Sequence, residues 1–65
     1  MNMKYETETQ KAVVETLVSE GYKIIGTSMS RLNRYRMVVL SKGRTKIGIN
    51  SLGMHEKPTN PIHPL

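Results

Sequence analysis

The N-terminal third of the chain carries a helical pattern. Aliphatic side chains recur at the three- and four-residue spacing of one helix face, at Val13, Val14, Leu17 and Val18. Thr7 and Gln10 match a capping box, in which two side chains bind backbone N–H groups left free at a helix start. Gly21 supplies the left-handed residue that commonly follows a helix end. The pattern predicts a helix over 7–20 whose apolar side covers a sheet.

After Gly21 the spacing changes to the alternation that is typical of β-strands. Aliphatic and β-branched residues predict three strands, over 22–29, 34–40 and 44–51. A mostly polar stretch at 30–33 predicts the turn between the first two strands. Gly26 interrupts the first strand and indicates a bulge. The expected fold class is therefore α+β, with one N-terminal helix packed on a three-stranded antiparallel sheet in the order α-β-β-β.

The register of the second predicted hairpin follows from its apolar residues. A three-residue loop over 41–43 places Gly43 at the left-handed position that such loops need. This loop length pairs Met37 with Ile47 and Tyr35 with Ile49. The sheet face that carries Tyr35 and Met37 is then expected to face the helix. The opposite face combines two aliphatic residues with four cations: Val38, Leu40, Arg34, Arg36, Arg44 and Lys46. A one-residue slip would move every side chain to the other face, so we expect this register.

The end of the chain contains three prolines, at positions 58, 61 and 64. Because proline lacks a backbone N–H and restricts the residue before it, we expect an irregular tail that is extended or flexible. The predicted organisation is a single α+β domain over 1–53 and a tail over 54–65. The alternative is an arm that crosses to a second subunit, with Ile62 and Leu65 as apolar anchors.

Composition limits how this chain can be stabilised. With 65 residues it forms one small domain with a thin core, and only 5% of the residues are aromatic. The absence of cysteine excludes disulfides and thiolate zinc sites. Small domains often gain stability by association, so a homodimer and a monomer are left equally open.

The net charge of +5 is unevenly distributed along the chain. Residues 21–55 hold seven Lys and Arg side chains and no Asp or Glu, whereas four of the five glutamates precede residue 21. Such asymmetry is typical of proteins with polyanionic partners, although surface charge also serves solubility.

The residue types that common catalytic sites need are missing. The chain has no Asp and no Cys, which excludes the triads that use either one. It has no phosphate-binding glycine motif, and His55, Glu56 and His63 do not have the spacing of a metal site. We therefore expect a protein that is not an enzyme and that uses no cofactor or metal.

The chain shows no sign of membrane insertion or export. No run of residues approaches the roughly 20 apolar residues of a membrane span, and the N-terminal residues lack the apolar region of a signal peptide. The sequence predicts a cytoplasmic protein without a membrane partner.

The cations of residues 21–55 carry the functional expectation. Arginine binds phosphate with paired hydrogen bonds, which predicts a small nucleic-acid-binding accessory or regulatory protein. Its expected binding residues lie on the basic hairpin face and are Arg31, Arg34, Arg36, Lys42, Arg44, Lys46 and Asn50. The helix and three strands are similar in outline to the double-stranded-RNA-binding domain. That family's second helix has no counterpart here, so no residue roles are carried over.

Two alternatives stay open. Val38 and Leu40, exposed among arginines in the expected register, are typical of the centre of a protein interface. They predict a protein-binding modulator, for example a phage-type inhibitor of a larger host enzyme or polymerase. The same arginines suit a small phosphorylated or nucleotide ligand.

Overall fold

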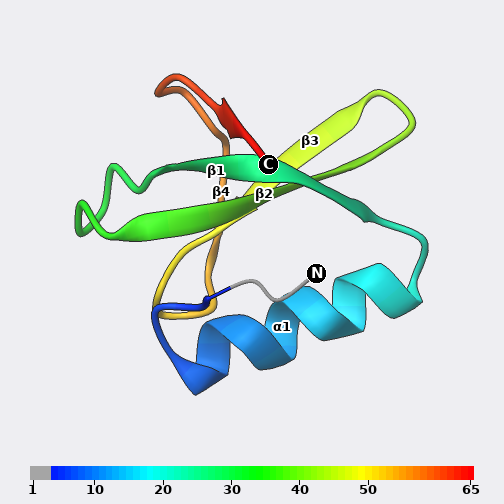
Figure 1. Ribbon diagram of the computed structural model, residues 1–65, viewed down its shortest axis with the longest axis horizontal. Helices are drawn as coiled ribbons and strands as arrows, with labels where there is room; N and C mark the ends of the chain where they lie inside the picture. The colour runs from blue at the N-terminus through cyan, green and yellow to red at the C-terminus, as the bar shows by residue number, and fades with distance from the viewer. Residues whose placement is uncertain (1–3) are drawn as a thin grey trace.

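The structure, a computed structural model, describes residues 4–65 and contains one helix and five strands within that range. The elements are α1 (Glu8–Ser19), β1 (Lys23–Met29), β2 (Arg36–Lys42), β3 (Thr45–Ile49), β4 (His55–Glu56) and β5 (His63–Pro64). The strands form one antiparallel sheet in the order β4-β3-β2-β1-β5. Figure 1 shows α1 along one side of this sheet and the C-terminal segment on the other. The expected α+β class is confirmed, but the sheet has five strands where three were predicted, and the three predicted strands form its centre.

Both ends of α1 are set by the residues that the sequence indicated. The Thr7 side chain accepts a hydrogen bond from the backbone N–H of Gln10 at 3.1 Å. After the C-cap, Gly21 has a φ of 104°, and its N–H and that of the next residue donate to carbonyls of the last turn at 3.0 and 3.1 Å. The helix is one residue shorter at each end than predicted.

Gln10 does more than the capping pattern suggests. Its side chain is only 1% exposed and donates to the carbonyls of Arg36 and Ile49 at 3.1 and 3.0 Å. Its Oε1 accepts from the N–H of Glu6 at 2.7 Å. One amide therefore ties the start of α1 to β2 and β3.

The core lies between α1 and the sheet. Its buried members are Val14, Leu17, Val38, Leu40 and Ile49. Val38 and Leu40 are 1% and 0% exposed, so the prediction that they lie on a basic outer surface is wrong. They pack under the helix instead and leave no apolar centre there for a partner to bind.

The predicted register of the second hairpin, which placed Val38 and Leu40 on the outer face, is also wrong. Leu40 pairs with Ile47 and Val38 with Ile49, which leaves a two-residue turn at 43–44. Gly43 has a φ of 60° and occupies the first central position of that turn, where a type II′ turn requires a positive φ. The alternation in β2 could not fix the register because four consecutive residues, Met37 to Leu40, are all buried.

The C-terminal tail, predicted to be irregular and extended or flexible, adds two short strands to the sheet, and its other residues have no helix or strand. β4 pairs with β3 at one edge, and β5 pairs with β1 at the other. Between them, residues 57–62 pass over the face that α1 does not cover. The Ser28 hydroxyl donates to the carbonyls of Asn60 and Pro61 at 3.2 and 3.0 Å, and the Asn60 amide donates to the carbonyl of Met29 at 3.0 Å. This crossing segment explains why β2 is buried on both sides.

Gly26 permits the close approach of β5. The predicted bulge is confirmed, because the β1–β2 register shifts between Ile24 and Gly26. A Cβ atom at Gly26 would collide with the carbonyl of His63. The missing side chain therefore makes room for the second edge strand.

No helix within residues 4–65 has both the length and the apolar character that crossing a membrane requires.

Candidate nucleic-acid interface

The two signs of charge lie on different parts of the fold. Four of the five glutamates lie in α1 or immediately beside it, at Glu6, Glu8, Glu15 and Glu20. The predicted binding cations lie near the two ends of β2: Arg31, Arg34 and Arg36 at its start, and Lys42, Arg44 and Lys46 at its end and in the adjoining turn and strand. The positive charge is therefore divided into two groups.

The first group belongs to residues 30–36, called here the arginine loop. The N–H of Ser30 donates to the carbonyl of Tyr35 at 2.9 Å, and the N–H of Arg34 donates back to the carbonyl of Ser30 at 3.0 Å. The Ser30 hydroxyl accepts from the backbone N–H groups of Leu32 and Asn33 at 3.0 and 3.3 Å. These bonds give the loop one defined shape and leave its arginine side chains exposed.

Glu56 of β4 anchors this loop from outside. Its Oε1 accepts from the N–H of Arg31 at 3.0 Å, and its Oε2 accepts from the amide of Asn50 at 2.7 Å and from the hydroxyl of Ser30. Burial acts to raise the pKa of Glu56, but these donors to the charged form outweigh it and lower the pKa below its ordinary value of 4.5. The carboxylate is therefore a fixed acceptor that holds the loop to the tail.

Two hollows lie beside Met29 and Arg34, which line both. One, of about 240 Å³, is lined by Ser28, Met29, Arg34, Arg36 and His63. The other, of about 450 Å³, is lined by Met29, Ser30, Arg31, Arg34 and Asn60. Three predicted binding residues, Arg31, Arg34 and Arg36, are thus brought together, and His63 of β5 joins them. The sequence could not show this because β5 was not predicted.

Arg34 has an unusual backbone conformation. Its φ is 64°, and it is the one residue other than glycine with a positive φ among residues 4–65. An L-residue in this region costs about 1 kcal/mol or more relative to an ordinary conformation. The loop therefore keeps an arginine where glycine or asparagine would be more stable, which is a common feature of binding sites.

Tyr35 lies between Arg34 and Arg36 and is exposed over 59% of its surface. The prediction that it packs beside the helix is wrong, because it precedes β2 and the true register turns the helix-facing row to Val38 and Leu40. It lines a third hollow, of about 300 Å³, together with Glu6, Thr7 and Ser51. The sequence signal that could have indicated an exposed Tyr35 is its position between two arginines, Arg34 and Arg36.

Arg36 and Lys42 also have structural partners. Arg36 Nη2 donates to the carbonyl of Lys4 at 2.5 Å, and its Nε lies 3.5 Å from Glu6 Oε2. Lys42 Nζ donates to the carbonyl of Glu20 at 2.8 Å, beyond the last turn of α1, where the helix dipole favours a cation. Arg36, the last residue of the arginine loop, is therefore held in place, whereas Lys42 supports the helix end.

The second group of cations lies at the far end of β2. Arg44 is in the β2–β3 turn. Lys46 of β3 and Lys23 of β1 lie on either side of Ser41 of β2, with which both are paired. Six strand residues, about 20 Å at 3.3 Å per residue, separate this group from the arginine loop. The single basic face that was predicted for both groups does not exist in this register.

Asn50 has a structural place in the fold. It is fully buried, and its Oδ1 accepts from the N–H groups of Leu52 and Met54 at 3.0 and 2.9 Å. Its amide donates to Glu56. Because these bonds occupy the side chain, it is not available to a base as was predicted.

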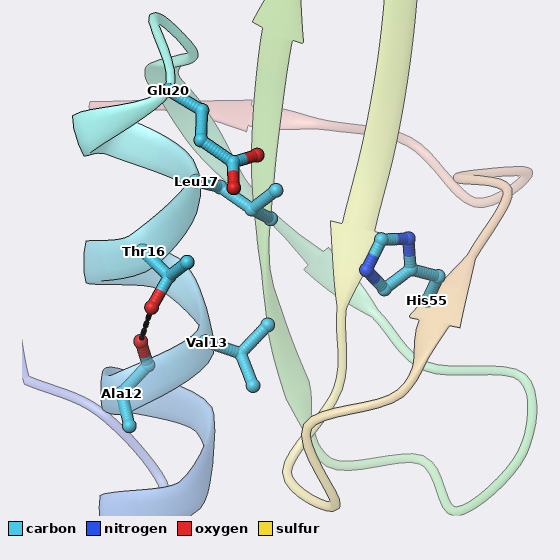
Figure 2. A pocket seen from close by; sticks show the side chains of 6 residues that line it. All are labelled: Ala12, Val13, Thr16, Leu17, Glu20 and His55. Carbon is cyan, nitrogen blue, oxygen red and sulfur yellow. Dashed lines mark hydrogen bonds between the residues drawn. The ribbon is translucent and has the colours of Figure 1, made fainter.

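A further hollow lies between α1 and β4. Figure 2 shows its lining residues, Ala12, Val13, Thr16, Leu17, Glu20 and His55, around a volume of about 420 Å³. The Thr16 hydroxyl donates to the carbonyl of Ala12 at 3.0 Å, so it is engaged within its own helix. The hollow supplies no base next to a free hydroxyl.

Within residues 4–65, no three His, Cys, Asp or Glu side chains are grouped to hold a metal ion. The exposed arginines and Tyr35 of the arginine loop suit anion binding and stacking. The carboxylate of Glu56, which anchors the loop, is occupied by hydrogen bonds. Comparisons with protein-family models, with curated proteins and with solved structures return no match to this chain.

Proposed function

We propose that this protein is a small nucleic-acid-binding accessory or regulatory protein that binds through the arginine loop. The observation that carries the proposal is an exposed aromatic ring, Tyr35, flanked by Arg34 and Arg36 beside two hollows lined by arginine. Proteins that bind nucleic acid combine cations for the backbone with aromatic rings for the bases.

The separation of charge supports the same proposal. The side of the fold that carries α1 is acidic, whereas the arginine loop and the β2–β3 turn are basic. A polyanion is attracted to these two cation groups and repelled by the glutamates of the helix, so approach across α1 is disfavoured. The second cation group, about 20 Å away, adds attraction without sharing the site.

A salt titration tests this proposal. The experiment measures fluorescence anisotropy of labelled DNA and RNA oligonucleotides at low salt, followed by stepwise addition of salt. We expect binding that weakens as salt rises, because each phosphate contact releases counterions. Arg34→Ala should weaken binding and reduce the slope of log affinity against log salt by about 0.7–0.9.

Arg44→Ala is the matched control. It removes the same side chain and the same charge at the opposite end of β2, in an exposed turn. A smaller loss of affinity than for Arg34→Ala supports the arginine loop as the site. Equal losses, or the absence of salt-dependent binding to either nucleic acid, would overturn the proposal.

A specific observation also favours a second candidate, a protein-binding modulator. The exposed apolar residues Leu32 and Leu52 lie in neighbouring loops that the hydrogen bond from Asn33 to the Ser51 hydroxyl (2.8 Å) joins. Apolar side chains rimmed by arginine are typical of protein interfaces. Leu52→Ser, which lies outside the arginine loop, should weaken a protein complex and leave oligonucleotide affinity unchanged, whereas unchanged protein binding would exclude this surface.

A further inference from the structure

The fold offers few elements that can enter a DNA or RNA groove. A major groove admits an α-helix or a two-stranded ribbon, but α1 and its C-cap residue expose the carboxylates of Glu8, Glu15 and Glu20. The β2–β3 hairpin carries cations near its turn, which suit contacts to phosphates, but it has no aromatic residue on which an unpaired base could stack. The aromatic ring lies instead in the arginine loop, at the other end of β2.

Tyr35 has the exposure that stacking against an unpaired base requires. More than half of its surface is free, and the residues that share its hollow are Glu6, Thr7 and Ser51. In a duplex the faces of the bases are covered by their neighbours, so only a single strand can place a base on such a ring.

Charge distinguishes the hollow lined by Tyr35 from the hollow of about 240 Å³ lined by Arg34 and Arg36. The Tyr35 hollow contains a carboxylate, Glu6, which repels phosphate and accepts hydrogen bonds from base N–H groups. The other hollow is lined by Arg34, Arg36 and His63 and by no carboxylate, and the Arg36 Nε lies 3.5 Å from Glu6 Oε2 at the boundary between the two hollows. Base and phosphate would therefore occupy different hollows around the start of β2.

The phosphate hollow is partly preorganised. Arg36 is held by the carbonyl of Lys4 and by Glu6, so its guanidinium loses little freedom on binding. Arg34 extends from a backbone that the bond to Ser30 fixes. Met29, half-exposed in the same hollow, offers an apolar contact to a sugar.

From this arrangement we infer that the arginine loop selects single-stranded nucleic acid. One base stacks on Tyr35, and an adjacent phosphate binds among Arg34, Arg36 and His63. This inference rests on the proposed function and specifies its ligand class.

The test compares a fluorescein-labelled 12-nucleotide single strand of mixed sequence with the same strand in a duplex, by anisotropy at one low salt concentration. We expect the single strand to bind roughly ten-fold more tightly or better. Tyr35→Ala should weaken single-strand binding by about 5- to 150-fold, the usual range for loss of one stacked base. Tyr35→Phe keeps the ring and should stay within about two-fold of the unaltered protein.

An abasic strand of the same length separates stacking from phosphate binding. It should bind Tyr35→Ala and the unaltered protein equally, and it should still respond to Arg34→Ala. Because Tyr35 is exposed, thermal unfolding by circular dichroism should show that both Tyr35 variants remain folded.

The outcomes distinguish the two proposals. Equal affinity for duplex and single strand, or no effect of Tyr35→Ala where Arg34→Ala weakens binding, overturns the inference and leaves the proposed function standing. Equally strong binding of a single nucleotide also overturns it, since the hollows then take a small phosphorylated ligand. If no nucleic acid binds, the proposed function itself fails.

Discussion

Replacing Glu56 with glutamine should destabilise the fold and loosen the arginine loop. The carboxylate accepts three donors: the Arg31 N–H at one oxygen, and the Ser30 hydroxyl and Asn50 amide at the other. The glutamine amide has one oxygen, so its NH₂ group must face one of these donors. At least one hydrogen bond is lost, and the others no longer involve a charged acceptor.

The magnitude follows from these bonds. A hydrogen bond to a charged group is worth about 1.5–3 kcal/mol, and Glu56 is only half-buried. We therefore expect a decrease of about 2 kcal/mol in the free energy of unfolding. For a domain of this size that is a fall of about 10 °C in Tm. Glu15→Gln, on the exposed side of α1, is the matched control and should change Tm by less than about 2 °C.

The same variant has a pH signature. The pKa of Glu56 is lowered in the folded protein, so the charged carboxylate contributes stability above its ordinary pKa of 4.5, and this stability is lost as the pH falls through the lowered value. Urea unfolding at pH 7 and pH 3 should show a smaller loss of stability on acidification for Glu56→Gln. Equal stability of the two proteins at pH 7, or an unchanged pH dependence, would refute the assigned role.

The remaining predictions concern the backbone and the two ends of β2. Gly26→Ala should cost roughly 2 kcal/mol or more, because its Cβ collides with the carbonyl of His63, whereas Gly43→Ala should cost only about 1 kcal/mol of strain in open space, as urea unfolding would measure. Gln10→Ala should cost about 3 kcal/mol, since two strand carbonyls lose their donor; a change below 1 kcal/mol would contradict this. Arg34→Asn should raise stability by about 0.5–1 kcal/mol and weaken oligonucleotide binding, and an unchanged affinity would argue against a binding role.

The helix was predictable because its signals are local. Thr7 and Gly21 act within a few residues of the ends that they define. The bulge at Gly26 was visible for the same reason. Each of these features depends on backbone geometry that one residue type favours.

The sheet was only partly predictable because its edges come from the tail. β4 and β5 contain two residues each, and β5 includes Pro64, which argues against a strand when read alone. Since the tail covers the second face, Met37 and Val39 are buried like their neighbours and the alternation disappears. The register error, and with it the misplacement of Val38 and Leu40, follows from that cover.

The candidate site could be predicted from the sequence as a concentration of charge but not as a geometry. Arg31, Arg34 and Arg36 do meet around shared hollows, but Lys42 and Arg44 lie at the other end of β2. The Glu56 anchor depends on contacts 25 and 26 residues apart, and no local pattern indicates them. Long-range hydrogen bonds of this kind are visible only once the fold is known.

The most direct test of the account is a ¹⁵N–¹H correlation spectrum of the protein titrated with a 12-nucleotide single strand. We expect chemical-shift changes to concentrate in residues 31–36 and at His63, with small changes at 43–46. Changes confined to the β2–β3 turn, or to the hollow between α1 and β4, would contradict binding at the arginine loop.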